Sequence, residues 1–220
     1  MLGSCMTKRE LKFPEKCEEL AEFVGIMLGD GNMFSLNRPG VCLNCIRVVG
    51  NSLTEKEYLF NFIKPLMESL FGARVCTYAN DRHEIFLIVH GKALVKFMQK
   101  IGIVCGNKIK AKATIPTWIS KSKRYLAACV RGLIDTDGSI YPLKPHYPNL
   151  LQICFKSKNP RLLKDMRISF KKLGYHPSKM TWNKIYLTRQ AEIDRYVKEI
   201  RFSNPHHFER YLAVRQASSF

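Results

Sequence analysis

Two aspartates occupy matching segments of this 220-residue chain, each at the end of a helical pattern. Asp30 follows the apolar run of FVGIMLGDG (residues 23–31), and Asp137 follows that of VRGLIDTDG (residues 130–138), 107 positions later. A single Asp-Gly pair is an ordinary turn signal. Its recurrence in the same apolar context indicates two carboxylates with a shared task, and such a pair can hold a hard divalent cation such as Mg²⁺.

The two aspartates can act together only if their helices meet. An acid at the carboxyl end of a helix is unfavourable by up to about 1 kcal/mol, because it faces the negative end of the macrodipole. Small residues four apart, Gly25 with Gly29 and Gly132 with Thr136, give each helix a stripe that another backbone can approach closely. We expect the helices to pack through these stripes, which places the carboxylates side by side. Two neighbouring carboxylates repel unless a cation neutralises them or one takes up a proton.

The charge of the chain suggests a polyanionic partner. There are 36 Lys and Arg against 18 Asp and Glu, a net charge of +18. The excess is greater in residues 120–220, with 20 basic and 7 acidic side chains, than in residues 1–119, with 16 and 11. Solubility needs a net charge of only about 2 to 8. Nucleic acid is therefore favoured over a membrane surface, and paired carboxylates that hold metal in a basic protein suit phosphodiester hydrolysis.

The sequence also predicts where the protein resides. No apolar run approaches the roughly twenty residues of a bilayer span, and the N-terminal residues lack the apolar core of a signal peptide. We expect an intracellular protein in a reducing compartment, with its 8 cysteines as thiols.

The elements around the aspartates occur twice in the same order. After each Asp-Gly, two extended runs, a helical pattern, a hairpin and a second helical pattern follow, which gives α-β-β-α-β-β-α in each half. Gly72 and Gly174 stand where helices end, and Pro65 should bend or interrupt the helix that contains it. The predicted strands are residues 32–36, 45–49, 74–79 and 84–89, then 139–143, 151–155, 179–181 and 184–188; the predicted helices after the motifs are 56–72, 91–103, 160–174 and 191–202.

Both segments resemble the LAGLIDADG motif, and the chain is similar to single-chain, two-motif LAGLIDADG homing endonucleases. The segments GNKI (106–109) and FSNPHHFER (202–210) extend this resemblance over nearly the whole chain. The first motif departs from the pattern, with Leu28 where an acid is usual, whereas Asp135 fills that place in the second. In the family this earlier acid more often serves helix packing and capping, so the departure leaves the metal ligands intact.

The resemblance implies an α+β fold of two pseudo-symmetric halves, residues 1–105 and 120–220, joined by a linker at 106–119. Each half would contribute an antiparallel four-stranded sheet to a saddle on double-stranded DNA. The implied activity of this monomer is site-specific cleavage of both strands, with a short stagger, at a long asymmetric target.

The resemblance also implies site residues. Asp30 and Asp137 would bind metal with the backbone carbonyls of Gly29 and Thr136; the metal would be Mg²⁺, with Mn²⁺ substituting and Ca²⁺ binding without cleavage. The basic residue beside the phosphate would be Lys108 in the first half and His207 in the second, with His206 and Lys156 as alternatives. Asn51 and Ser157, together with Lys156, match water-positioning sites. Predicted DNA contacts are Arg38, Arg47, Arg74, Arg82, Lys144, Gln152, Lys179, Lys184 and Arg189.

Other interpretations differ in strength. An EF-hand loop around DTDGSI fails, because Leu133 and Lys144 would stand at its first and twelfth positions, where acids belong. Cys42 with Cys45, or His206 with His207, gives too few ligands for a zinc site. A maturase that binds intron RNA and a DNA-binding regulator without cleavage activity share the fold. The two intact aspartates argue against the inactive regulator, whereas maturase activity can coexist with cleavage.

Overall fold

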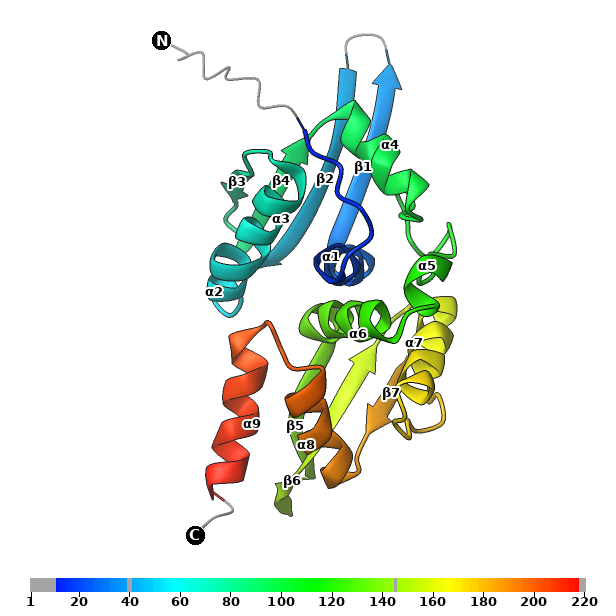
Figure 1. The fold of residues 1–220 in the computed structure, drawn as a ribbon. Coiled ribbons are helices and arrows are strands. Elements are labelled where there is room, and N and C mark those ends of the chain that lie inside the picture. The colour runs from blue at the N-terminus through cyan, green and yellow to red at the C-terminus, as the bar shows by residue number, and fades with distance from the viewer. Residues whose placement is uncertain (1–10, 39–40, 145, 218–220) are drawn as a thin grey trace.

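The computed structural model describes residues 11–38, 41–144 and 146–217 (Figure 1). Side chains are described for these residues except 37, 38, 41 and 42. The fold is α+β, with two antiparallel sheets on either side of a central pair of helices. No helix within the described ranges is long and apolar enough to cross a membrane.

The first half builds a four-stranded sheet in the order β1-β2-β4-β3. β1 and β2 form one antiparallel hairpin, and β3 and β4 form the other, as the alternation of apolar residues predicts. The elements of this half are α1 (Glu18–Leu28), β1 (Gly31–Arg38), β2 (Val41–Asn51), α2 (Lys56–Tyr58), η1 (Leu59–Ile63), α3 (Lys64–Phe71), β3 (Cys76–Ala79), β4 (Glu84–His90) and α4 (Lys92–Lys100).

Pro65 does not end the helix that contains it. α2, η1 and α3 run on continuously, and the five residues of η1, directly before the turn of Pro65, are in π-helical register. Proline has no N–H to donate to the preceding turn, and a local π-helical turn is one way a helix accommodates such a break in its hydrogen-bond ladder. The helix ends at Gly72, whose φ of 61° is left-handed, as its sequence position predicts.

The second half repeats the plan with one strand fewer. Its elements are α6 (Lys123–Asp137), β5 (Gly138–Lys144), β6 (Tyr147–Lys156), α7 (Pro160–Lys172), β7 (Lys184–Leu187) and α8 (Gln190–Glu199), preceded by the short α5 (Thr117–Ser120) and followed by α9 (Pro205–Ala217). Gly174, with φ of 81°, follows the end of α7. The sheet order is β5-β6-β7.

The predicted fourth strand of the second sheet, residues 179–181, is wrong for the described chain. Thr181 forms an isolated bridge to Lys184, and the N–H of Ser178 donates to the carbonyl of Tyr186 at 2.9 Å, but no continuous ladder joins the segment to β7. Pro177 has no N–H for a ladder, and the N–H of Tyr186 donates to the side-chain oxygen of Ser178 at 3.1 Å. Because a hydroxyl takes this ladder bond, the backbone of this segment does not continue as a strand.

Each sheet has one face covered by helices and one open face. α4 packs on β1 and β2 in the first half, and α8 packs on β6 in the second (Figure 1). The covered faces hold the core, for example Ile46 and Leu87 in the first sheet and Ile153 in the second, all at most 1% exposed. The alternate residues of the strands point to the open faces.

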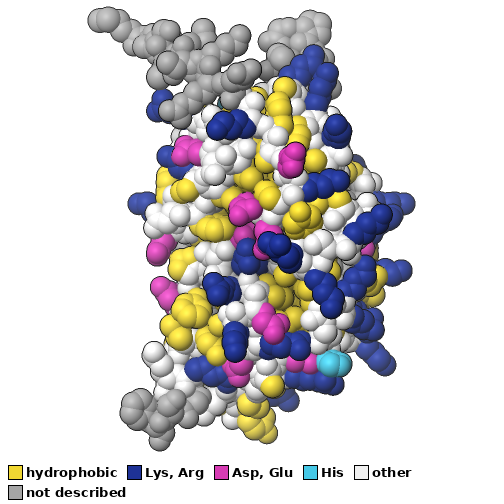
Figure 2. Space-filling view, in the orientation of Figure 1, with side chains coloured by type: hydrophobic (Ala, Val, Ile, Leu, Met, Phe, Trp, Pro, Cys, Tyr) yellow, Lys and Arg dark blue, Asp and Glu magenta, His cyan; other side chains and the backbone are white. Residues whose placement is uncertain are grey.

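Positive charge is not confined to the open faces. Figure 2 shows many Lys and Arg side chains on the helix-covered side of the molecule. On α7 the exposed side chains include Arg161, Lys164 and Lys171, which share one side of the helix.

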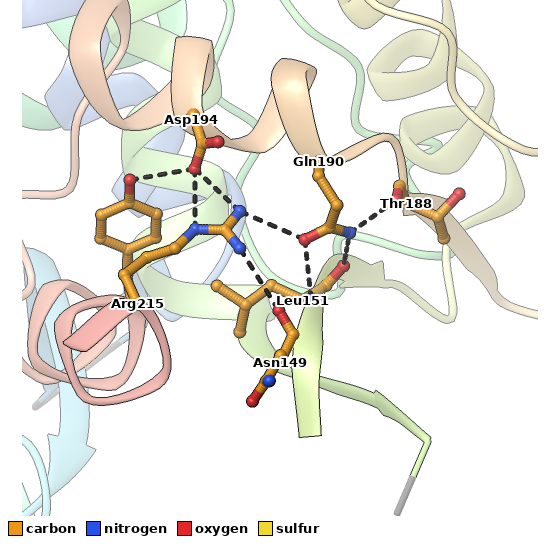
Figure 3. A network of polar contacts seen from close by, with 7 residues as sticks. Asn149, Leu151, Thr188, Gln190, Asp194 and Arg215 are labelled. Atoms are coloured by element: carbon orange, nitrogen blue, oxygen red, sulfur yellow. Dashed lines mark hydrogen bonds and ion pairs between the residues drawn. The ribbon is translucent and has the colours of Figure 1, made fainter. Parts of the chain in front are cut away.

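Helix α9 was not predicted, and a polar network fastens it to the second half (Figure 3). Arg215 on α9 donates to Asp194 on α8 at 2.8 and 3.0 Å, and to Gln190 at 3.2 Å. Gln190 in turn bonds with both backbone groups of Leu151 on β6. The network therefore joins α8, α9 and the sheet.

Candidate metal and nucleic-acid site

Helices α1 and α6 are in backbone contact through their glycines. A Cβ built at Gly25 would overlap the carbonyl oxygen of Cys129, and one built at Gly132 would overlap that of Glu22. The same 107-residue offset relates both glycines and both partners, so the contact obeys a pseudo-two-fold axis. The predicted small-residue stripes are confirmed.

The glycines next to each aspartate fit the same geometry. Gly29 and Thr136 are equivalent positions, and they face each other at the helix ends, where a Cβ at Gly29 would overlap the Thr136 side chain. Gly31 and Gly138 follow the aspartates, and a Cβ there would overlap the last turn of its own helix. An acid between two small residues is thus explained by a close helix contact before it and a sharp exit into a strand after it.

Asp30 and Asp137 therefore lie together at the ends of α1 and α6, both half-buried. Burial, the charge of Asp137 and the charge of Glu55 raise the pKa of Asp30 to about 7, while Lys108 opposes this shift. Burial also raises the pKa of Asp137 to about 6, again against Lys108. The protein alone supplies too little positive charge for two ionised carboxylates, and a cation would supply it.

The residues fit a hard divalent cation. The predicted donor set comprises the carboxylates of Asp30 and Asp137 and the backbone carbonyls of Gly29 and Thr136, all oxygen atoms, which Mg²⁺ and Ca²⁺ prefer. Within the described chain, no three Cys, His, Asp or Glu side chains group together as a metal site. One or two carboxylates with further oxygen atoms and water is a usual set for Mg²⁺.

Lys108 lies against the carboxyl end of α1. Its ammonium donates to the carbonyl oxygen of Gly29 and, at 3.4 Å, to that of Met27. Burial lowers the pKa of Lys108, although Asp137 and Asp30 both raise it. This predicted basic residue is therefore beside both carboxylates.

His207 holds the matching place in the second half but differs in charge. Its imidazole is 6% exposed and lies by the carbonyl of Ile134, the counterpart of Met27. Burial, Arg210 and His206 lower the pKa of His207 to about 4, and neither ring nitrogen forms a hydrogen bond of good geometry with any residue that the structure describes. The structure thus places a neutral imidazole where the sequence predicts a basic group. The two alternative basic residues are more exposed than His207. His206 lies within 4.0 Å of Glu209, and Lys156 is exposed at the end of β6.

The predicted water-positioning residues are engaged in turns. The side-chain oxygen of Asn51 accepts from the N–H groups of Leu53 and Thr54 at 2.8 and 3.3 Å. Ser157 accepts from the N–H of Asn159 at 3.2 Å. Sequence analysis missed Glu55, whose carboxylate accepts from the N–H of Asn51 at 2.7 Å and adds to the negative charge around Asp30.

A buried polar network also escaped the sequence analysis. Arg131 on α6 forms an ion pair with Glu22 on α1 at 2.5 Å, and Ser203 donates to Glu22 at 2.6 Å. Asp135, 1% exposed, accepts from the N–H of Ser203 at 2.8 Å, and burial raises its pKa well above the usual value. The earlier acid of the second motif therefore fixes the segment before α9.

The equivalent places in the opposite halves are all apolar. The counterparts of the four network residues, related by offsets of 107 in the helices and 99 in the following segment, are Cys129, Val24, Leu28 and Val104. Leu28 is 3% exposed and packs in the core, which explains why the first motif tolerates a leucine at the usual position of an acid.

The predicted DNA contacts divide into three groups. Arg47 lies on the open face of the first sheet, over the rings of Phe34 and Phe86 at 4.7 and 5.3 Å, and Gln152 and Lys184 lie on the open face of the second. Arg74, Arg82, Lys144 and Lys179 are exposed at strand ends and turns. Arg189 is instead paired with Glu192 at 3.5 Å, and the side chain of Arg38 lies outside the described residues.

Residues 124–201 match the family model of the LAGLIDADG-like domain. This part of the chain is a LAGLIDADG-like domain. No curated protein matches the chain. Among solved structures, I-DmoI in complex with DNA and Mn is 16% identical with a TM-score of 0.61, over 84% of this chain and 96% of that one. I-DmoI with DNA and Ca is 17% identical with a TM-score of 0.60, over 83% and 88%.

A different protein shares the fold. Full-length DUF199/WhiA from Thermatoga maritima is 17% identical with a TM-score of 0.53, over 94% of this chain and 63% of that one. The chain therefore shares the fold of these structures over most of its length, and the family match covers its second half. At such low identity the likeness establishes the fold, and the chemistry must be argued from the site.

Proposed function

We propose that the protein is a divalent-metal-dependent endonuclease that cuts both strands of double-stranded DNA. The observation that carries the proposal is the pair of carboxyl groups, Asp30 and Asp137, at the joined ends of α1 and α6. Their raised pKa values mean that the pair lacks positive charge, which a metal would provide. I-DmoI, whose fold the chain shares, binds DNA with Ca and with Mn.

Each residue then has a role. Asp30 and Asp137 would hold the metal with the carbonyls of Gly29 and Thr136, and a bound metal would activate a water and stabilise charge on the phosphate. The ammonium of Lys108 adds positive charge beside the carboxylate pair. His207 lines the equivalent position in the second half as a neutral group.

The open sheet faces are the proposed DNA-binding surface. Arg47 and Gln152 lie on them and have side chains that can read base edges. The two halves differ in sequence and in strand number, so we propose that the DNA target is long and asymmetric. We further propose that the protein cuts it with a stagger, as a monomer, in a reducing intracellular compartment. The two proposed domains of this monomer are the halves at residues 1–105 and 120–220.

Selection from a randomised duplex library in Mg²⁺ tests the proposal. The wild-type protein should enrich cleaved ends that share one long sequence, and a plasmid that carries this sequence should become linear. Asp30→Asn and Asp137→Asn should bind the plasmid but cut it at least about 10³-fold more slowly, because each removes a metal ligand. Glu199→Gln, a change of an exposed acid on α8, is the matched control and should cut normally.

If the Asn variants cut as fast as the wild type, the proposed chemistry is wrong. If the wild type binds duplex DNA tightly and never cuts it, the protein is a DNA-binding regulator of the same fold. These outcomes separate the enzyme from the binding module.

Intron RNA is a second candidate ligand, favoured by the basic side of α7, away from the open sheet faces. Charge reversal of Lys164 and Lys171 to glutamate should weaken binding of a structured RNA while it leaves DNA cleavage unchanged. Equal RNA binding by wild type and variant would remove this candidate.

A further inference from the structure

The two hairpin tips beside the site each bond to the serine that follows the neighbouring strand, but they differ in loop length, in the position of the positive φ and in side chain. In the first half the tip is residues 80–83, and the carbonyl of His83 accepts from the N–H of Ser52 at 2.7 Å. In the second half the tip is residues 181–184, and the carbonyl of Asn183 accepts from the N–H of Ser157 at 2.9 Å. The exposed residue before this carbonyl is Arg82 in the first half and Trp182 in the second.

Trp182 is exposed and strained. Its side chain is 98% exposed, although it is the largest apolar side chain type, and it contributes nothing to the core. The backbone φ of Trp182 is 54°, a left-handed value that is unfavourable for a bulky residue. Thr181 and Lys184 exchange both backbone hydrogen bonds at 3.0 Å across a two-residue turn, where glycine or asparagine is preferred at a position with positive φ. Neither folding nor packing requires tryptophan here, and such outliers gather at functional sites.

The tip lies at the end of the sheet nearest the carboxylates. Gly138, directly after Asp137, pairs with Phe155, and the next residue of β6, Lys156, pairs with Lys184 at the start of β7. The tip is therefore about two strand spacings, roughly 10 Å, across the sheet from the exit of Asp137.

The surroundings of the tip are strongly positive. Lys156 and Lys184 are direct cross-strand neighbours on the open face, an arrangement that is unfavourable without a counterion. Lys158 and Lys179 are exposed nearby, and within the described residues none of the four lysines forms an ion pair. Phosphate groups complement such a cluster, and an exposed indole among them is suited to a base.

We propose that Trp182 stacks on an unstacked base of the bound duplex beside the cleavage junction, on the second half only. This inference rests on the proposed DNA binding. The indole acts as a wedge that stabilises a bent or opened base step, while the four lysines hold the flanking phosphates. The arginine at the first-half tip contacts phosphate instead, so the duplex is deformed on one side.

Intrinsic fluorescence reports this contact directly, because the chain has only 2 tryptophans. Trp118 is half-buried and donates to the carbonyl of Ile101 at 2.9 Å. In a Trp118→Phe variant the emission comes from Trp182 alone. A pool of random-sequence 40-bp duplexes in Ca²⁺ should quench this emission and protect it from acrylamide. Emission of the reverse variant, Trp182→Phe, should change little.

Affinity measurements separate stacking from charge. Trp182→Ala should weaken binding to a duplex pool with a central two-base mismatch by about 5- to 100-fold, with an unchanged salt dependence. Trp182→Phe should retain most of the affinity. Lys179→Ala, the matched control, should lower the salt dependence. The wild type should prefer mismatched over matched duplexes, because opened steps cost less to unstack, and Trp182→Ala should lose this preference.

Stability measurements exclude a structural role. Trp182→Gly should melt no lower than the wild type, since glycine relieves the left-handed backbone, yet it should bind as weakly as Trp182→Ala. A melting temperature several degrees lower would make Trp182 a structural residue and overturn the inference. Normal DNA binding by Trp182→Ala would overturn it while leaving the proposed function intact, and absence of DNA binding by the wild type would overturn both.

Discussion

Lys108 and His207 hold equivalent places against the two motif helices, beside the carbonyls of Met27 and Ile134, but they differ in charge. Lys108 is an ammonium that donates to backbone carbonyls at the end of α1. His207 is neutral at pH 7, because burial and nearby positive charge lower its pKa to about 4. The pseudo-two-fold arrangement of the chain therefore does not extend to its electrostatics.

This difference predicts unequal cleavage of the two DNA strands. A supercoiled target plasmid should pass through a clearly populated nicked form before it becomes linear. Lys108→Met should slow one strand by about 10²- to 10³-fold, the usual loss when a charge-stabilising donor is removed. His207→Lys should shorten the lifetime of the nicked form, provided that the variant melts as the wild type does. Strand-labelled time courses measure both effects, and equal rates for both strands in the wild type would refute the prediction.

The pKa of Asp30 predicts how stability depends on pH. It is about 7 in the folded protein against an ordinary value of 3.8, so the folded state binds more protons between these values. The free energy of unfolding therefore falls as pH rises from about 4 to 7, by about 4 kcal/mol at most. In metal-free protein, Asp30→Asn should melt higher than the wild type at pH 8 and about equally at pH 4.

Divalent metal should reverse this dependence, because it binds the ionised pair. At pH 8, Mg²⁺ or Ca²⁺ should raise the melting temperature of the wild type more than that of Asp30→Asn. Calorimetry at both pH values, with metal and with EDTA, makes the comparison. Identical melting curves for both proteins at pH 8 without metal would show that the ionised carboxylate of Asp30 does not destabilise the folded protein.

The backbone contact between α1 and α6 predicts a large steric effect of a single methyl group. Gly25→Ala should destabilise the protein by several kcal/mol, since a Cβ there meets the Cys129 backbone, which cannot move aside as a flexible side chain could. Gly106→Ala is the control: its φ of 74° carries a left-handed penalty of about 1 kcal/mol, but no atom lies within 4 Å of the added Cβ. Denaturant unfolding compares the two, and a similar loss in both variants would exclude a close helix contact.

The buried network between Glu22 and Arg131 predicts strongly non-additive substitutions. Arg131→Val alone should cost about 3 to 5 kcal/mol, because it leaves the carboxylate of Glu22 buried without its partner. The fourfold variant that gives each network residue the apolar type of its counterpart, Glu22→Cys with Arg131→Val, Asp135→Leu and Ser203→Val, should cost less than this single change. Unfolding measurements on both variants test the prediction, which fails if the fourfold variant is the less stable one.

The part of the fold that the sequence predicted depends on local spacing. Small residues four apart, Gly25 with Gly29 and Gly132 with Thr136, specify a narrow helix face, and the aspartates directly after them were enough to predict that the two helix ends meet. The missing fourth strand of the second sheet could not be predicted, because the hydroxyl of Ser178 takes a ladder bond that the pattern assigns to backbone. The charge of His207 depends on its burial at the start of α9, a helix that no periodicity indicated.

The same limit applies to the ion pair of Arg131 and Glu22. In the sequence, both residues have the pattern of ordinary exposed charges on amphipathic helices. They become buried partners only because the helices approach so closely. Sequence spacing indicates where two surfaces touch, whereas the protonation of the groups between them depends on every element that covers the contact.

The one-sided distribution of the buried charges has a consequence for assembly. If two copies of the first half paired with each other, each Glu22 would meet the valine and leucine of the other copy, and no arginine would be present. If two copies of the second half paired, each Arg131 would face a cysteine. Only a first half against a second half pairs Glu22 with Arg131, so this ion pair disfavours homodimers of either half.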